Sequence, residues 1–125
     1  MNLEKIENSI FLRQVYGLNI VTDHVKIIMF SIERMEYVKL SLSPRQRAMH
    51  LPRKWQEYDG LYFDIIYSGI SSLYLNFDNT ENGFSEMAMQ FGDSGKNSIS
   101  IAGQLEIKFE FEFARSQNFQ PSLLE

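Results

Sequence analysis

Hydrophobic and charged positions alternate strictly in residues 105–113. One set of alternate positions is apolar and the other is charged: Leu105, Ile107, Phe109, Phe111 and Phe113 against Glu106, Lys108, Glu110 and Glu112. Successive side chains of a β-strand point to opposite faces of its sheet. The segment therefore predicts a strand with one buried apolar face and one face in water, which is typical of an antiparallel sheet covered on one side.

Shorter alternating or β-branched stretches predict six further strands, about seven in all. They cover residues 25–32, 38–42, 61–67, 73–77, 87–91 and 99–101. The first stretch is apolar at both sets of alternate positions, so we expect it to be buried on both faces. The connection over residues 43–59 is long and contains Pro44 and Pro52. A connection of this length usually has a function or contains a short element of its own.

The ends of the chain differ from this β-rich centre. Leu3, Ile6 and Ile10 begin a rough helical stripe, so residues 2–16 predict a helix with Asn2 as its cap and Gly17 at its end. Residues 116–125 predict a loose tail. We therefore expect one domain over residues 1–125, mainly β with an α+β character. Its antiparallel β region would cover residues 23–115 as a sandwich or a strongly curved sheet.

Composition narrows the classes of function. The chain has no cysteine, which excludes disulfides and thiolate chemistry, and its net charge of −4 argues against nucleic acid as the main partner. No apolar run approaches the length of a membrane span. The first seven residues include acids and no apolar stretch. We therefore expect no signal peptide and a cytoplasmic location.

Charge is unevenly distributed along the sequence. Residues 37–56 contain five basic residues and no acid, and residues 55–95 contain seven acids and no Lys or Arg. The two segments either form separate surfaces that could steer a charged partner or neutralise each other after folding. If they stay separate, the candidate acidic binding residues are Asp59, Asp78, Glu81, Glu86 and Asp93.

The basic segment over residues 45–55 also contains the single tryptophan. Arg47 and Trp55 are candidate binding residues, because arginine and aromatic side chains are enriched in interface hot spots. The same composition suits a phosphate-binding patch. A third interpretation is a solvated loop in which Trp55 covers an open edge of the core.

No catalytic, metal or cofactor motif is present in the sequence. The two histidines, His24 and His50, lack a partner at zinc-site spacing, and no G-x-S-x-G motif occurs. The turn over residues 92–97 lacks the spacing of a phosphate loop. These patterns favour a non-enzymatic binding protein without a cofactor. A small-ligand-binding barrel or sandwich, lined by the many Phe, Tyr and Met residues, is the alternative. An enzyme is less favoured, and Asp23 and His24 would be its best candidates.

A series of short features runs through residues 6–43. They are residues 6–8, 11–12 and 16–17, Asp23, and the hairpin of residues 25–32 and 38–42. This series resembles the beginning of the immunity protein 50 family. Residues 61–66, 69–70 and 73–75 resemble the paired strands that follow in the family. The family signature around the aspartate is here Val21-Thr22-Asp23-His24-Val25, and only Asp23 matches it.

The resemblance implies a bacterial cytoplasmic protein that neutralises a toxin domain by binding it. It implies a protein partner. The lack of an apolar span predicts no membrane partner, and the sequence does not indicate an oligomeric state. If the toxin were a basic nuclease, the acidic residues between 57 and 93 would form its docking surface.

Overall fold

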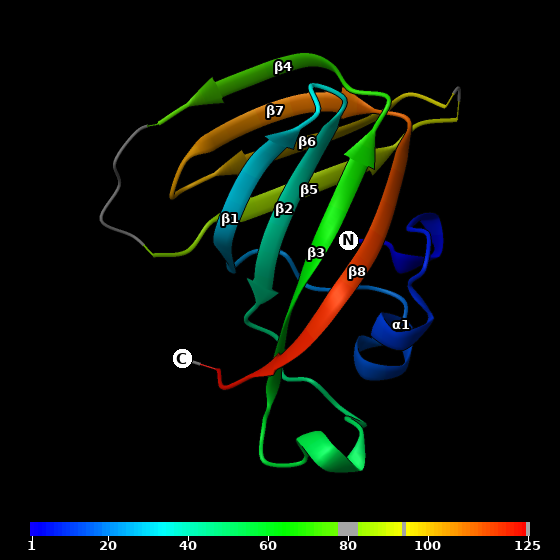
Figure 1. Ribbon diagram of the computed structural model, residues 1–125, viewed down its shortest axis with the longest axis vertical. Coiled ribbons are helices and arrows are strands. Elements are labelled where there is room, and N and C mark those ends of the chain that lie inside the picture. The colour runs from blue at the N-terminus through cyan, green and yellow to red at the C-terminus, as the bar shows by residue number, and fades with distance from the viewer. Residues whose placement is uncertain (78–82, 94, 125) are drawn as a thin grey trace.

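The computed structural model describes residues 1–77, 83–93 and 95–124. In this part of the chain, eight strands form two four-stranded antiparallel sheets (Figure 1). The prediction of a mainly β, antiparallel fold is confirmed. In the same residues no helix is long and apolar enough to cross a membrane.

The chain builds most of the first sheet, then the whole second sheet, and returns to complete the first. The first sheet has the order β1-β2-β3-β8. It comprises β1 (Val25–Glu33), β2 (Tyr37–Pro44), β3 (Gly60–Ser68) and β8 (Phe113–Ser122). The second sheet has the order β4-β7-β6-β5. It comprises β4 (Ser71–Asn76), β5 (Glu86–Phe91), β6 (Asn97–Ala102) and β7 (Glu106–Phe111). Figure 1 shows the second sheet behind the first, with its strands running across those of the first sheet.

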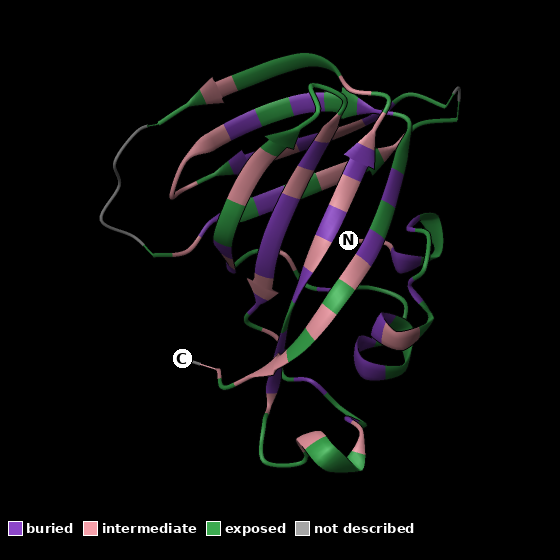
Figure 2. Cartoon of the chain, viewed as in Figure 1, coloured by how far each residue is buried: buried purple, intermediate pink, exposed green. Residues whose placement is uncertain are grey.

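The core lies between the two sheets and is filled largely by aromatic and branched side chains. Burial alternates along β3 and β7, as the banding in Figure 2 shows. The Tyr67 ring from the first sheet packs edge-on against Phe109 and Phe111 of the second, with centroids 5.1 and 4.9 Å away. These aromatic side chains fill the interior by packing against one another.

The alternating segment forms β7 as predicted, but β7 ends at Phe111 and the predicted strand ended at Phe113. Ile107, Phe109 and Phe111 are buried, while Lys108 and Glu110 face water. Phe113 was expected on the buried face, yet it is 58% exposed. The chain leaves the second sheet at Glu112 and enters the first sheet at Phe113, which ends the alternation.

The predicted N-terminal helix is present, but its predicted bounds, residues 2–16, are wrong. A 3-10 helix (Leu3–Lys5), capped by Asn2, is followed by α1 (Ile10–Tyr16), which ends at Gly17. Between them Glu7 pairs with β8, accepting from Ser116 N at 3.0 Å and donating to Ala114 O at 2.9 Å. Asn8 then has a positive φ of 59°. Pairing with the sheet edge therefore interrupts the helix.

The predicted loose tail over residues 116–125 is also wrong, because most of it belongs to β8. The strand has few apolar residues, and its buried polar residue, Ser116, is hydrogen-bonded by the N-terminal segment. Ser116 is fully buried, and its hydroxyl donates to the carbonyl of Asn8 at 2.7 Å. The Asn8 side chain donates in turn to the Ser116 carbonyl at 2.9 Å.

The expectation that residues 25–32 are buried on both faces is wrong as well. β1 is an edge strand of the first sheet, and Ile28 and Met29 are 51% and 50% exposed. The long connection over residues 43–59 does contain a short element, a 3-10 helix (Arg53–Trp55).

Candidate functional site: two grooves beside Phe84

The edges of the two sheets are joined where β1 and β5 begin. Val25 and Ser85 exchange two backbone hydrogen bonds, with N to O distances of 2.8 and 2.7 Å. Met87 N also donates to Thr22 O at 2.9 Å. These bonds bring the segment before β1 against the start of β5, although about 60 residues separate them in sequence.

The Gln104 side chain fixes the same junction. Its Oε1 accepts from Ile27 N at 2.8 Å, and its Nε2 donates to Ile27 O at 3.1 Å. Ser85 is buried, and its hydroxyl donates to Gln104 Oε1 at 3.2 Å and accepts from Gln104 N at 3.0 Å. The junction is therefore held by a closed network of backbone and side-chain bonds.

A groove opens on this junction and gathers two of the predicted residues. Asp23, His24 and Glu86 line it together with Phe84, Ser85, Ala102 and Gly103. Asp23, His24 and Glu86 are all exposed. We call this the acidic groove. The resemblance singled out Asp23 and the charge pattern singled out Glu86, and the junction places both on one concave surface.

Phe84 forms the ridge of the site. The Arg45 guanidinium lies over its ring, 5.2 Å from the centroid, and the His24 ring meets it edge-on at 6.4 Å. Arg45 and His24 also share a shallow pocket with Asp23. Cationic and acidic side chains are thus held within one small area around an aromatic ring.

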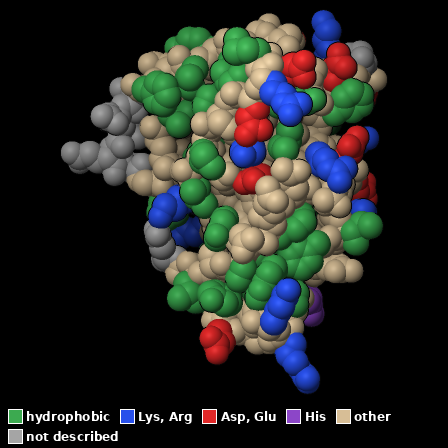
Figure 3. Space-filling view, viewed as in Figure 1, with side chains coloured by type: hydrophobic (Ala, Val, Ile, Leu, Met, Phe, Trp, Pro, Cys, Tyr) green, Lys and Arg blue, Asp and Glu red, His purple; other side chains and the backbone are tan. Residues whose placement is uncertain are grey.

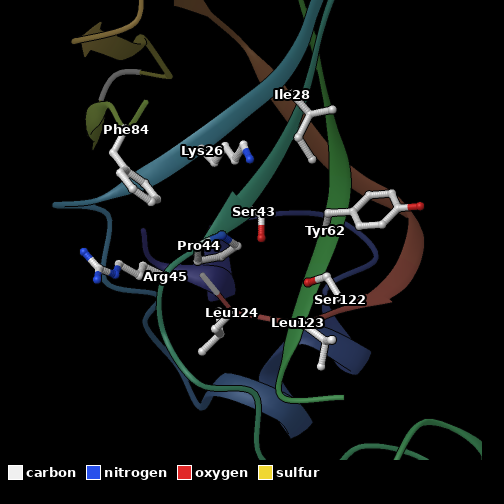
Figure 4. Close-up of a pocket in the computed structure, with 10 residues that line it drawn as sticks. All are labelled: Lys26, Ile28, Ser43, Pro44, Arg45, Tyr62, Phe84, Ser122, Leu123 and Leu124. Atoms are coloured by element: carbon white, nitrogen blue, oxygen red, sulfur yellow. The ribbon is translucent and has the colours of Figure 1, made fainter. Parts of the chain in front are cut away.

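On the other side of Phe84 lies a second groove of about 310 Å³ (Figure 4). Phe84 and Tyr62 stand on opposite sides of it, with Ser43 and Pro44 between them. The described residues that line it include two basic side chains, Lys26 and Arg45, and no acid. We call this the basic groove.

The other predicted site residues lie elsewhere. Asp59 precedes β3, and its carboxylate accepts from Leu124 N at 2.8 Å. Asp93 is exposed in the turn between β5 and β6. Arg47 is exposed in the connection before the 3-10 helix. The predicted residues Asp78 and Glu81 fall outside the described residues. The structure thus unites Asp23 and Glu86 and disperses the others that it describes.

Trp55 has a packing role. Its ring meets Phe11 of α1 edge-on, with the centroids 5.9 Å apart, and Phe11 packs against Phe119 of β8 at 5.1 Å. The Lys54 ammonium lies over the Trp55 ring, 5.1 Å from its centroid. This geometry agrees with the interpretation in which Trp55 covers an edge of the core.

Charge on the outer face of the first sheet is mixed. In Figure 3, which views this face, Asp and Glu side chains lie among Lys and Arg side chains. Lys39 forms an ion pair with Glu33 at 3.0 Å, and its pKa is raised by hydrogen bonding to Glu33 and by the negative charges of Glu33 and Asp64. Asp64 accepts hydrogen bonds from Ser41 and from Asn118 on the neighbouring strands.

The chemistry of the acidic groove favours binding. A catalytic carboxylate is normally tuned by burial, whereas Asp23 and Glu86 are exposed. Among the described residues that line this groove, the one buried hydroxyl is that of Ser85, which donates to Gln104 Oε1 and accepts from Gln104 N. Across the described ranges, no three His, Asp or Glu side chains are grouped as around a metal ion. Exposed charges beside an aromatic ring suit contact with another protein.

Sequence reasoning missed Phe84 and Gln104. Both lie in irregular segments beside strands, where no periodic pattern exists, and their roles depend on pairing between distant segments. Phe84 directly follows an Asn-Gly turn signal. That signal predicts a change of chain direction and carries no information about what the next side chain contacts.

Comparisons with known proteins add one finding. Residues 8–122 match the family model of immunity protein 50. No curated protein and no solved structure matches the chain. The matched range includes every residue that lines the acidic groove, Asp23 among them.

Proposed function

Because the chain belongs to the immunity protein 50 family, we propose that it neutralises a toxin domain by binding it directly, without catalysing a reaction. The observation that carries the proposal is the acidic groove. It places Asp23, the residue that matches the family signature, beside Glu86 on an exposed concave surface. We further propose that the protein acts in the bacterial cytoplasm.

The side chains that line the acidic groove indicate which chemical groups the partner would present. Two exposed carboxylates, Asp23 and Glu86, face a partner from the same concave surface, which the Phe84 ring also lines. The Arg45 guanidinium lies over that ring. An aromatic centre with charged groups at its rim is the usual composition of a protein-binding hot spot. The proposed contact is therefore a basic side chain of the toxin seated between Asp23 and Glu86, with apolar surface against Phe84.

The overall charge supports a basic partner. The chain carries a net charge of −4, so long-range attraction would accelerate its encounter with a basic domain, such as a nuclease domain. Steering of this kind can raise association rates by roughly 10- to 1,000-fold and weakens as salt increases.

The experiment has two steps. The tagged chain is used to capture its partner from the source strain, and the captured protein is identified by mass spectrometry at low and high salt. The partner's domain is then expressed in a bacterium with and without the chain. The proposal expects the domain alone to arrest growth and co-expression to restore it. A captured domain that is harmless, or whose toxicity persists during co-expression, would contradict the proposal.

A further inference from the structure

We propose that the free edge of β1, between Ile28 and Glu33, takes up an extended strand of the toxin domain. This inference rests on the proposed function and specifies how the toxin is held. Three features of the molecule carry it. In the first part of the edge, other segments of the chain already bond to the backbone of β1. In the second part, the outward backbone groups of β1 have no strand beside them among the described residues, and apolar side chains are exposed there.

The first part of the β1 edge is already occupied within the chain. Val25 pairs with Ser85 through two backbone hydrogen bonds, and Ile27 pairs with the side-chain amide of Gln104. The backbone groups of Val25 and Ile27 therefore point away from β2, towards the edge. An edge strand left open is a template for pairing with another chain, so this cover limits where such pairing can occur.

In the part of the chain that the structure describes, no strand covers the second part of the edge. A β-bulge between Ile27 and Met29 shifts the register, after which Phe30 pairs with Leu40 and Ile32 with Val38. Antiparallel strands alternate between residues that bond to the neighbour and residues that point outward. This alternation directs the N–H and C=O groups of Phe30 and Ile32 to the edge. Among the described strands, β2 is the sole partner of this part of β1.

The side chains beside this edge indicate an apolar occupant. Ile28, Met29 and Ile32 are 51%, 50% and 45% exposed. Phe30 and Ile32 lie opposite the buried residues Leu40 and Val38, so they belong to the inner face of the sheet, whereas Met29 lies on the outer face. A strand that pairs with β1 would therefore contact apolar side chains of β1 on both the inner and the outer face of the sheet. Hydrogen bonds to the backbone groups of β1 would supply affinity, and the apolar contacts would determine which toxin sequences bind.

A second copy of the chain fits this edge poorly in the antiparallel register that uses the outward groups of both Phe30 and Ile32. Antiparallel self-pairing that joins Phe30 to Ile32 of the copy would place residues 34–36 of each chain opposite residues 26–28 of the other. That stretch includes Ile27, where Gln104 already occupies the edge. The hairpin tip includes Met35, which is 91% exposed and projects beyond the strand. A short strand from a different protein avoids this collision.

Among the other edge strands, β4 is less suitable. Its pairing with β7 is interrupted between Ser71 and Tyr74, and Ser72 has a positive φ of 56°. Regular pairing is thereby confined to Tyr74, Leu75 and Asn76. An irregular backbone of this kind protects an edge from further pairing.

The test measures binding of the captured toxin domain by calorimetry. Ile32→Pro removes the outward N–H, which β2 does not use, and Ile32→Ala is the matched control that keeps the N–H and shortens the side chain. We expect Ile32→Pro to raise Kd by about tenfold or more, because it removes a main-chain hydrogen bond and displaces the bound strand. Ile32→Ala should raise Kd less. Equal effects of the two variants, or no effect of either, would overturn the proposal.

Hydrogen exchange keeps the test decisive if the proline variant does not fold. In the wild-type chain, the amides of Phe30 and Ile32 should exchange fast alone and at least about tenfold more slowly in the complex. Fast exchange of both amides in the complex would reject strand pairing. A wild-type dimer that Ile32→Pro dissociates would assign the edge to a second copy instead. Failure of the wild-type chain to bind any toxin domain would contradict the proposed function itself.

Discussion

The side-chain amide of Gln104 pairs with the backbone of Ile27 as a neighbouring strand would. Ile27 N donates to Oε1 at 2.8 Å, and Nε2 donates to Ile27 O at 3.1 Å. One side chain from the connection between β6 and β7 thus closes part of the β1 edge. It also separates the acidic groove from the open part of that edge.

Removal of this amide should destabilise the fold. In Gln104→Ala, the N–H and C=O of Ile27, a residue only 7% exposed, would lose their partners. We expect the free energy of unfolding to fall by about 1–3 kcal/mol, measured by urea denaturation. Gln90→Ala, at an exposed position of β5, is the control and should stay within about 0.5 kcal/mol of the wild type. Equal stability of Gln104→Ala and the control would disprove the structural role of the pair.

Two phenylalanines test where the alternating strand ends. Phe109 is 2% exposed between the sheets, and Phe113 is 58% exposed at the start of β8. Phe109→Ala should lower the free energy of unfolding by about 3–5 kcal/mol through lost burial and a residual cavity. Phe113→Ala should cost about 1 kcal/mol or less. The arrangement of the core would be wrong if thermal melting ranked the two variants in the opposite order.

The strands that bury one apolar face could be predicted from the sequence, because every second residue along them is apolar. β3 and β7 are examples, with every second side chain in the core. β8 could not be predicted, since its buried Ser116 is satisfied by the backbone of Asn8 rather than by apolar packing. The interruption of the predicted N-terminal helix at Glu7 could not be predicted either. Glu7 pairs with a strand that lies more than 100 residues further along the chain.

The candidate site was predicted only in part. Asp23 was found through the family resemblance and Glu86 through the charge pattern, but their meeting depends on the bonds between Val25 and Ser85. Pairing between segments this far apart leaves no local pattern in the sequence. A single acidic surface was one of the two alternatives for the acidic segment, and folding places its described members Asp59, Glu86 and Asp93 on different elements.

Stability should fall in alkaline solution because of two buried tyrosines. Burial raises the pKa of Tyr67 and of Tyr16 above the ordinary value of about 10. The folded state keeps both phenols neutral while the unfolded state ionises, so their contribution is complete below pH 10 and is lost as the pH rises further. Each group should reduce the free energy of unfolding by up to about 1.4 kcal/mol per pH unit above 10.

Tyr67→Phe should reduce this alkaline loss, measured by urea denaturation between pH 8 and pH 11. Tyr74→Phe, at an exposed position of β4, is the control and should behave as the wild type. An unchanged pH dependence in Tyr67→Phe would contradict the assigned cause.

Charge reversal tests the acidic groove. The double variant Asp23→Lys with Glu86→Lys should raise the Kd for the toxin domain by about tenfold or more and flatten the salt dependence of binding. Glu4→Lys with Glu57→Lys changes the net charge equally at exposed positions outside the groove and should have a smaller effect. Equal weakening by both double variants would mean that net charge, and not the groove, determines affinity.

The most direct test of the central claim is a titration of the toxin domain's activity with the purified chain. Neutralisation by direct binding predicts that activity falls in proportion to the added chain, reaches its minimum at a fixed molar ratio, and does not decline further with time. Complete inactivation of the toxin by a small molar fraction of the chain, progressing with time, would contradict the account and identify the protein as an enzyme.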